Sequence, residues 1–173
     1  MTLRAYLALL VVLTIATIAA CSSPDANARI GVSAQPRDQF DPVGALVVHR
    51  CGSLDCHGQV GRNLRVWGCE GQRLDPNDVP GCRASGGKDT TEDEYEATYR
   101  SIVGLEPAVM SDVVANHGQN PEELTFVRKA RGDESHKGGH VVTPGDEQDV
   151  CIASWLASQT DTATCQKAVT DFP

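Results

Sequence analysis

The sequence contains few of the large side chains that usually build a protein core: two Trp, three Tyr, three Phe and two Met among 173 residues. Its longest apolar run, residues 5–20, has sixteen residues, which is short for a helix that spans a membrane. With 40% hydrophobic and 22% charged residues, the chain still has the composition of a folded domain. These features exclude a multi-span membrane protein and a fully disordered chain, and they leave room for about one domain.

Positive charge is also scarce. The chain carries 15 Lys and Arg against 23 Asp and Glu, a net charge of −8 with neutral His. Proteins that bind nucleic acids neutralise phosphates with clustered Lys and Arg, so we expect no nucleic-acid partner. Cysteine, in contrast, is abundant, with seven residues in a short chain. Covalent links or a bound cofactor would compensate for the sparse core.

The N-terminus has the pattern of an export signal. Met1 to Arg4 is short and positively charged, and the apolar run of residues 5–20 contains no charge. The run ends in Ile18-Ala19-Ala20-Cys21, which resembles the box of bacterial lipoproteins. The resemblance implies removal of residues 1–20 and acylation of Cys21 by chains such as palmitate, which anchor a protein to a membrane. An ordinary secretory signal is the alternative.

The rest of the chain is expected to lie outside the cytoplasm. Residues 21–39 are polar and show no apolar period, so we expect a flexible tether there. Residues 40–173 would form a single domain in the cell envelope, on the periplasmic face of a membrane or on the outer membrane. Thiols tend to pair in such compartments, so the six cysteines that remain should each be bonded.

Local patterns predict a small, mostly helical and loop-rich domain. Asp41-Pro42 is typical of a helix start, with Asp41 as the N-cap, and this helix should deliver Cys51. Thr91 to Glu94 is a capping-box pattern that opens another helix. Further helices are expected over residues 107–115 and 121–129, with one or two helical turns around Cys165.

Another helix should follow Asp146, a candidate N-cap. Its inner face would contain Val150, Ile152, Trp155 and Leu156. The Gly-rich segments 58–89 and 132–145 show no long periodic pattern, so we expect them to be loops.

The segment Cys51-Gly-Ser-Leu-Asp-Cys56-His57-Gly58 carries the clearest chemical pattern. Two cysteines followed directly by His, in an exported chain, resemble the haem-attachment motif of c-type cytochromes. That motif usually has two residues between the cysteines, and this segment has four. The resemblance implies haem c, bound covalently through thioethers at Cys51 and Cys56, with His57 as the proximal iron ligand.

Other segments extend the resemblance. Asn63-Leu64-Arg65 is similar to a stretch after the haem site in some exported bacterial cytochrome domains. His136-Lys137-Gly138-Gly139 and Trp155-Leu156 resemble their last loop and last helix. In a cytochrome c the last helix crosses the first, and the loop before it often carries the distal ligand. The resemblance therefore implies a cytochrome c-like fold with His136 as the first candidate for the distal ligand, Met110 as the second and His140 as the third, or an open distal position.

Four cysteines remain after these assignments: Cys69, Cys82, Cys151 and Cys165. They allow three pairings, and the sequence alone does not choose among them. We expect the local pairing, Cys69–Cys82 and Cys151–Cys165. Each bond would close a loop of about 15 residues and contribute roughly 3 kcal/mol to stability.

Two rival interpretations keep the fold and remove the haem. Cys51 and Cys56 can form a third disulfide in a stapled lipoprotein without a cofactor, a binding or scaffolding module of the cell envelope. Cys51, Cys56 and His57 can also bind zinc with a further His, although adjacent Cys and His are awkward ligands for a closed tetrahedral site.

The interpretation that accounts for most of these features is a membrane-anchored c-type cytochrome. It would transfer single electrons through haem c to a redox protein partner whose identity the sequence does not give. Such a protein is expected to be an electron carrier rather than an enzyme, because a hexacoordinate iron favours electron transfer over catalysis.

Overall fold

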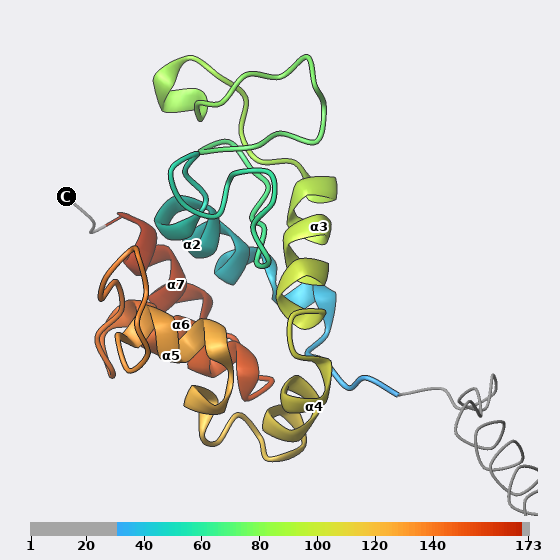
Figure 1. Cartoon of the computed structure of the whole chain (residues 1–173), viewed down its shortest axis with the longest axis vertical. Helices are drawn as coiled ribbons and strands as arrows, with labels where there is room; N and C mark the ends of the chain where they lie inside the picture. The colour runs from blue at the N-terminus through green and yellow to red at the C-terminus, as the bar shows by residue number, and fades with distance from the viewer. Residues whose placement is uncertain (1–30, 171–173) are drawn as a thin grey trace, which may run out of the picture. The chain divides into compact units, whose positions relative to one another are not determined.

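The structure is a computed structural model that describes residues 31–170, so the expected lipidation site Cys21 lies outside the described residues. The described helices belong to one compact unit that begins at Val32. Residues 31–170 contain no strand, so the prediction of a mostly helical, loop-rich domain is confirmed (Figure 1). The α-helices are α2 (Asp41–Cys51), α3 (Glu92–Val103), α4 (Pro107–Ala115), α5 (Thr125–Arg131), α6 (Glu147–Leu156) and α7 (Thr162–Thr170), and the short 3-10 helices are η1 (Arg37–Gln39), η2 (Arg83–Ser85) and η3 (Pro121–Glu123).

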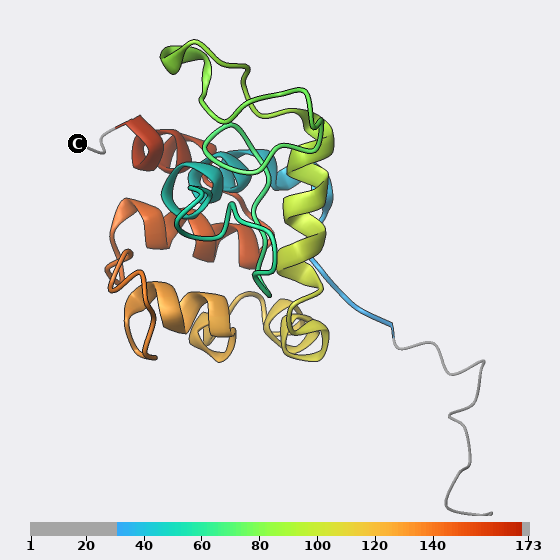
Figure 2. The ribbon, with the colours of Figure 1, turned by 45° about the horizontal axis from the view of Figure 1, so that its top comes forward.

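Helix α2 lies at the centre of the domain and packs against α3, α6 and α7 (Figures 1 and 2). Phe40, the residue before α2, contacts Trp155 of α6 at a ring-centroid distance of 5.3 Å and Tyr99 of α3 at 5.5 Å. Phe40 and Trp155 are both fully buried. Aromatic pairs at these distances stabilise a core beyond the burial of their area. Three of the chain's eight aromatic residues therefore meet where α2, α3 and α6 pack together.

Two of the predicted helix starts are confirmed in atomic detail. The hydroxyl of Thr91 accepts from the backbone N–H of Glu94, whose carboxylate accepts from the N–H of Thr91. Asp146 caps α6 by accepting from the N–H of Asp149. Both caps satisfy N–H groups that a helix leaves without partners in its first turn.

The prediction for Asp41 is wrong in one respect. Helix α2 begins at Asp41 itself, and Phe40 occupies the N-cap position without a side-chain hydrogen bond. The Asp41 carboxylate instead pairs with the guanidinium of Arg37, four residues earlier. Pro42 lies in the first turn as expected, where its missing N–H costs nothing.

The inner face of α6 also differs from the expectation. Val150 is 38% exposed, whereas Asp149 and Cys151 are buried beside Ile152, Trp155 and Leu156. The disulfide between Cys151 and Cys165 binds α6 to α7, so the face that carries Cys151 turns inward. The expected helix over residues 121–129 is in fact two, because the extended backbone of Leu124 separates η3 from α5.

The packed domain begins before the predicted boundary at residue 40. Gln35 is 1% exposed, and its side-chain amide donates to the carbonyl of Leu156 while accepting from the hydroxyl of Ser158 at 2.6 Å. The hydroxyl of Tyr99 donates to the backbone carbonyl of Gln35 at 2.7 Å. The end of the expected tether is therefore part of the fold, held by hydrogen bonds that its polar sequence did not indicate.

Both expected disulfides are present, Cys69–Cys82 and Cys151–Cys165. Disulfides form and persist in oxidising compartments, so they indicate a location outside the cytoplasm. No helix within residues 31–170 is both long and apolar enough to cross a bilayer.

The segment between α2 and α3 projects from the helical body at the top of Figure 1, and a buried ion pair fixes its base. Arg73 donates to both carboxylate oxygens of Glu94, at 2.7 and 3.0 Å, and both side chains are 2% exposed. Arg73 also donates to the carbonyls of Lys88 and Asp89, so one guanidinium holds both ends of the projecting segment. Burial alone would raise the pKa of Glu94, but hydrogen bonds from Arg73 and from the N–H groups of Thr91 and Leu74 outweigh it and lower that pKa.

Replacing Glu94 by Gln should therefore destabilise the domain by about 3 kcal/mol at neutral pH, because the buried charge of Arg73 would lose its two short carboxylate contacts and keep only the longer one, at 3.8 Å, to Asp78. In the wild-type protein, the ionised Glu94 carboxylate contributes fully to the free energy of unfolding above the ordinary carboxyl pKa of about 4.3. This contribution is lost as the pH falls through the lowered pKa of Glu94 in the folded protein. Urea denaturation of the wild-type protein and the Glu94→Gln variant at pH 7 and pH 3 measures their free energies of unfolding. The difference between these two free energies should be smaller at pH 3 than at pH 7. Glu92→Gln, at an exposed residue of the same helical turn, is the matched control; an equal effect of both substitutions would contradict the assignment.

Candidate functional site

A cavity of about 450 Å³ lies between α2, α3, α5 and α6. Its walls are mostly apolar, and they include Leu46 and Val47 of α2, Ile102 of α3, Phe126 of α5 and Ile152 of α6. Cavities of this size with apolar walls and a few polar groups are typical of cofactor and small-molecule sites. The polar groups that line this one include Cys51, His57 and His136, three of the residues singled out by the sequence.

The loop after α2 brings Cys51 and His57 together. Helix α2 ends at Cys51, and the backbone N–H of His57 donates to the carbonyl of Cys51 at 2.9 Å. Within the loop, the N–H groups of Cys56 and Gly58 both donate to the carbonyl of Ser53 at 3.0 Å. The loop thus folds back on the end of the helix, which places His57 at the cavity beside Cys51.

Three glycines allow this loop to pack backbone against backbone. A Cβ atom at Gly58 would lie 1.7 Å from the carbonyl oxygen of Gly52, and one at Gly71 would lie 1.9 Å from the same oxygen. The N–H of Gln72 donates to the carbonyl of Gly58 at 2.9 Å across this contact. Side chains at Gly58 and Gly71 would therefore push the loop away from its present position.

The His57 imidazole is oriented by the backbone. Its Nδ1 lies 2.9 Å from the carbonyl oxygen of Leu64, so Nδ1 carries the proton and donates it to that oxygen. Nε2 then keeps its lone pair, the arrangement found in metal-binding histidines. Burial lowers the pKa of His57, and the charges of His136 and Arg62 add to that effect, while the bond to Leu64 opposes it. The neutral imidazole, the form that binds metals, is therefore favoured.

His136 faces His57 across the same cavity. The two ring centroids lie 5.8 Å apart, and the ring planes differ by 19°. Nδ1 of His136 lies 3.3 Å from the carbonyl oxygen of Gly139, so this ring too is bonded to the backbone through Nδ1. Two imidazoles that bind one metal ion from opposite sides, with N–metal bonds of about 2 Å, have centroids about 6 Å apart. The observed separation is close to that value, but the two rings are stacked, so they would have to turn to bind one ion together.

The remaining candidates for the distal ligand lie elsewhere. Met110 of α4 is fully buried in the hydrophobic core and is not among the residues that line the cavity. His140 is exposed, and its Nε2 lies 2.7 Å from the carbonyl oxygen of Val142. The hydrogen bond to this carbonyl engages Nε2. The structure therefore brings His57 and His136 together and separates Met110 and His140 from them.

Cys51 and Cys56 are both free thiols, and both are half-buried. Burial raises the pKa of Cys51 to about 11; the charge of Arg50 opposes this shift, and Cys56 adds to it. The Cys51 thiol is therefore protonated at neutral pH and is a weak nucleophile in the folded protein. Cys56 immediately precedes His57 in the loop.

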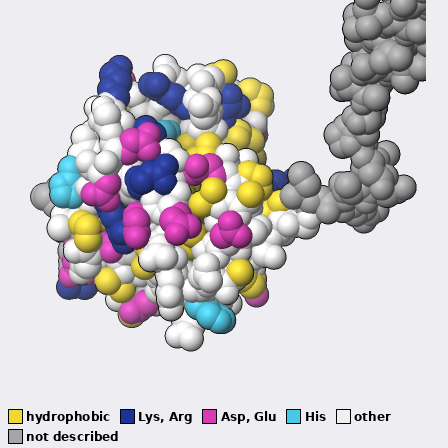
Figure 3. Space-filling model, turned by 60° about the horizontal axis from the view of Figure 1, so that its bottom comes forward, with side chains coloured by type: hydrophobic (Ala, Val, Ile, Leu, Met, Phe, Trp, Pro, Cys, Tyr) yellow, Lys and Arg dark blue, Asp and Glu magenta, His cyan; other side chains and the backbone are white. Residues whose placement is uncertain are grey.

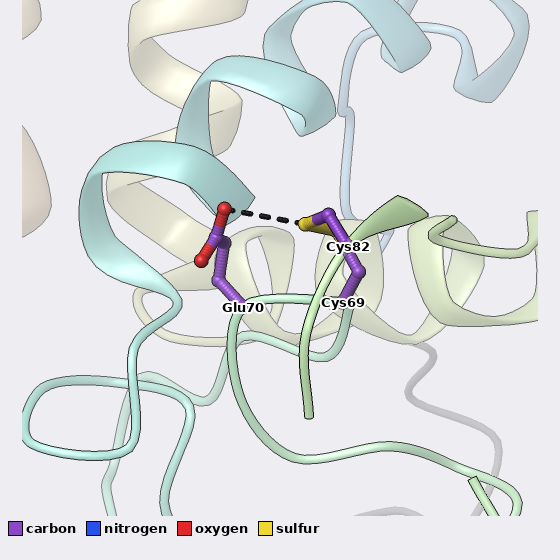
Figure 4. Close-up of side chains that lie close together, drawn as sticks. All are labelled: Cys69, Glu70 and Cys82. Atoms are coloured by element: carbon purple, nitrogen blue, oxygen red, sulfur yellow. Dashed lines mark hydrogen bonds between the residues drawn. A yellow bond between two sulfur atoms is a disulfide. The ribbon is translucent and has the colours of Figure 1, made fainter. Parts of the chain in front are cut away.

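A second group of metal-ligating residue types, Cys69, Glu70 and Cys82, lies within the segment between α2 and α3 (Figure 4). A carboxylate oxygen of Glu70 lies 3.2 Å from the sulfur of Cys82. The two cysteines are joined in a disulfide, however, and metals bind thiolates. These residues thus have a structural role, as the sequence predicted for the cysteines.

Sequence reasoning missed the groups that orient the histidines, because they are backbone carbonyls of Leu64 and Gly139, which no residue type marks. No family model matches this sequence, and no curated protein or solved structure matches it. A function for the chain is therefore inferred from the residues around the cavity and from their geometry.

The two free thiols should differ in reactivity. In the folded, cofactor-free protein, iodoacetamide at pH 8 should alkylate Cys56 at least about tenfold faster than Cys51, whose thiolate fraction is suppressed by its raised pKa. Both cysteines lie on the tryptic peptide of residues 51–62, so tandem mass spectrometry of this peptide after timed quenching assigns the label to each cysteine and measures both rates. In urea the two rates should become similar, since unfolding removes the burial; a difference that persists in urea would show that burial is not its cause.

Proposed function

We propose that this chain is a c-type cytochrome of the cell envelope that transfers single electrons through covalently bound haem. The observation that carries the proposal is the pair of imidazoles, His57 and His136, which line one apolar cavity, with the Nδ1 atom of each bonded to a backbone carbonyl. Nε2 is the candidate ligand atom of each ring, and the stacked rings would have to turn to direct both atoms at one metal ion. The two free thiols of Cys51 and Cys56 adjoin the proximal ring in the order that haem attachment requires.

The residues present fit such a group. Cys51 and Cys56 would hold haem by thioether bonds, His57 would be the proximal ligand and His136 the distal one. When bound, haem supplies a one-electron couple whose potential depends on its axial ligands. Ligation by two histidines gives a lower potential than ligation by His and Met, and it leaves no open position for a substrate. Electron transfer is thus favoured over catalysis.

The protein's own contribution is orientation and exclusion of water. The Leu64 carbonyl fixes the tautomer and the plane of the His57 ring. Apolar side chains from α2, α3, α5 and α6 surround the imidazoles, and they lower the local polarity on which a redox potential depends. The disulfides and the buried ion pair Arg73–Glu94 keep the surrounding loops in place.

We further propose that the domain is anchored to a membrane through a lipid on Cys21. The sequence before this residue resembles a lipoprotein signal, and the disulfides agree with an extracytoplasmic location. Such an anchor would hold the cytochrome near a redox protein partner in the same compartment.

The decisive experiment is expression with export and a cytochrome c maturation system, followed by a haem stain on a denaturing gel and a visible spectrum. Haem that survives denaturation would establish covalent attachment. His57→Ala should then shift the absorption bands of the attached haem, while His117→Ala, at an exposed turn, should leave them unchanged. An unchanged spectrum in the His57 variant would contradict the ligand assignment. A protein without haem would instead support the stapled binding module, with the cavity as its ligand site.

The position of His136 should depend on Gly138. A Cβ atom there would lie 2.9 Å from Cε1 and 3.3 Å from Nδ1 of the His136 ring, so Gly138→Ala should displace the ring from its present position. Gly139 has a φ of 74° with nothing within 4 Å of a Cβ, and Asn tolerates this backbone conformation. Gly139→Asn is therefore the matched control in the same turn.

We expect Gly138→Ala to alter the spectrum and the reduction potential of the haem protein, and Gly139→Asn to alter neither. These readouts are chosen because a change in stability alone would not move them. If both variants retain the wild-type spectrum and potential, His136 is not the distal ligand.

A further inference from the structure

A second hollow, of about 520 Å³, adjoins the cavity on the protein surface. Arg62 and Asn63 line both of them, so the two spaces meet at these residues. We call the second hollow the arginine groove; besides Arg62 and Asn63, its lining includes Arg65, Trp67, Asp93 and Arg100. The loop after His57 forms one side of the groove, and α3 forms the other.

Two guanidinium groups in the groove have no carboxylate partner. Arg62 donates to the backbone carbonyls of Cys56 at 3.0 Å and Asp55 at 3.4 Å. The guanidinium of Arg65 lies 5.3 Å from the centre of the Trp67 ring, a cation–π contact. Neither forms an ion pair with any residue in the described part of the chain.

The other charges of the groove do not neutralise these two. Arg100 pairs with Glu96 at 2.5 Å, and Glu96 pairs with Arg37 as well, at 3.1 Å. Asp93 is the remaining carboxylate of the groove lining, and it is exposed and forms no ion pair with Arg62 or Arg65. The Glu96 carboxylate is thus shared by two other arginines, and the positive charge of Arg62 and Arg65 stays available.

This arrangement is unusual for a chain with a net charge of −8. On the face shown in Figure 3, side chains of both signs are interspersed. Ion pairs such as Arg131–Asp149 and Arg128–Glu134 show the same neutralisation elsewhere in the domain. In an acidic protein that pairs most of its arginines, two that face a shared groove without a counter-charge mark a binding surface.

We propose that the arginine groove is the docking site for an acidic segment, rich in Asp and Glu side chains, of the protein that exchanges electrons with this chain. That the partner exchanges electrons rests on the function proposed above. Guanidinium groups bind carboxylates through paired hydrogen bonds, and Arg and Trp often dominate the energetics of interfaces. The groove meets the cavity at Arg62, which is itself bonded to the carbonyl of Cys56.

The loop that carries Cys56 and His57 also presents apolar side chains to solvent. Leu54 is 50% exposed and Val60 is 69% exposed, and Val60 lies two residues before Arg62 in the chain. Complementary charge orients the encounter of two proteins and raises its rate.

The test uses the full chain and a hexaglutamate peptide, with binding followed by two-dimensional NMR of the Trp indole N–H groups. The protein has two Trp residues: Trp67 lines the groove, and Trp155 is fully buried in the core. We expect the Trp67 signal to shift on addition of the peptide and the Trp155 signal to stay in place. Arg62→Gln with Arg65→Gln should weaken binding at least about tenfold, by loss of two charge-assisted contacts.

Arg83→Gln is the matched control, because Arg83 is an exposed arginine of the projecting segment that pairs with Asp89. Equal shifts with hexalysine, unchanged affinity in the double variant, or an equal loss in the Arg83 variant would each overturn the proposal. Displacement of the peptide by an equal concentration of sulfate would also overturn the proposal, because it would identify a site for small anions only. Stronger binding to phosphatidylglycerol vesicles than to the peptide would overturn it as well.

The outcome is distinguishable from that of the proposed function, because peptide binding does not require haem. If the protein binds the peptide but acquires no covalent haem when it is exported with the maturation system, the docking site is kept and the cytochrome is rejected. Haem attachment without peptide binding would keep the cytochrome and reject the docking site. If the haem-free protein binds the peptide and the haem-loaded protein does not, the two arginines serve the cofactor, and the proposal of a partner site fails.

Discussion

The position of α2 is the constraint on which the rest of the structure depends. Phe40 fixes the start of the helix against Trp155 and Tyr99, and α2 packs on α3, α6 and α7. Because the helix is held in this way, its C-terminal residue Cys51 always reaches the same wall of the cavity. A chain with so few aromatic residues gains most when they meet at such a point, since large rings contribute the greatest burial per residue.

Local signals in the sequence predicted those parts of the fold that depend on neighbours along the chain. The capping box at Thr91 and the cap at Asp146 require only residues within one helical turn, and the two disulfides join cysteines 13 and 14 positions apart. The exposure of Val150 could not be predicted in this way, because the periodic pattern of α6 fits two faces. The bond between Cys151 and α7 decides between them.

In the candidate site, too, the sequence indicated some residues, and others could be found only from the structure. Cys51, His57 and His136 were singled out through the resemblance to c-type cytochromes, and they line one cavity. The pair Arg73–Glu94 and the arginine groove arise from residues 21 or more positions apart, brought together only when the loop after α2 packs on α3. Hydroxyl groups of α3 hold that loop: Thr98 accepts from the N–H of Trp67, and Ser101 accepts from the N–H of Arg65. A sequence gives no direct sign of such contacts.

The spacing of Cys51 and Cys56 is the feature in which this chain departs from the usual haem-attachment motif, and the structure offers a physical reason why the departure is tolerable. The additional residues are taken up by a turn in which the Ser53 carbonyl accepts from two N–H groups. The loop can therefore be longer and still return the N–H of His57 to the carbonyl of Cys51. In the proposed haem site, His57 would need a fixed ring orientation near the end of the helix. The packing of Gly52 against Gly58 holds the loop, and the carbonyl of Leu64 orients the ring. For this proposed role, the hydrogen bonds that close the loop would compensate for the two additional residues between the cysteines.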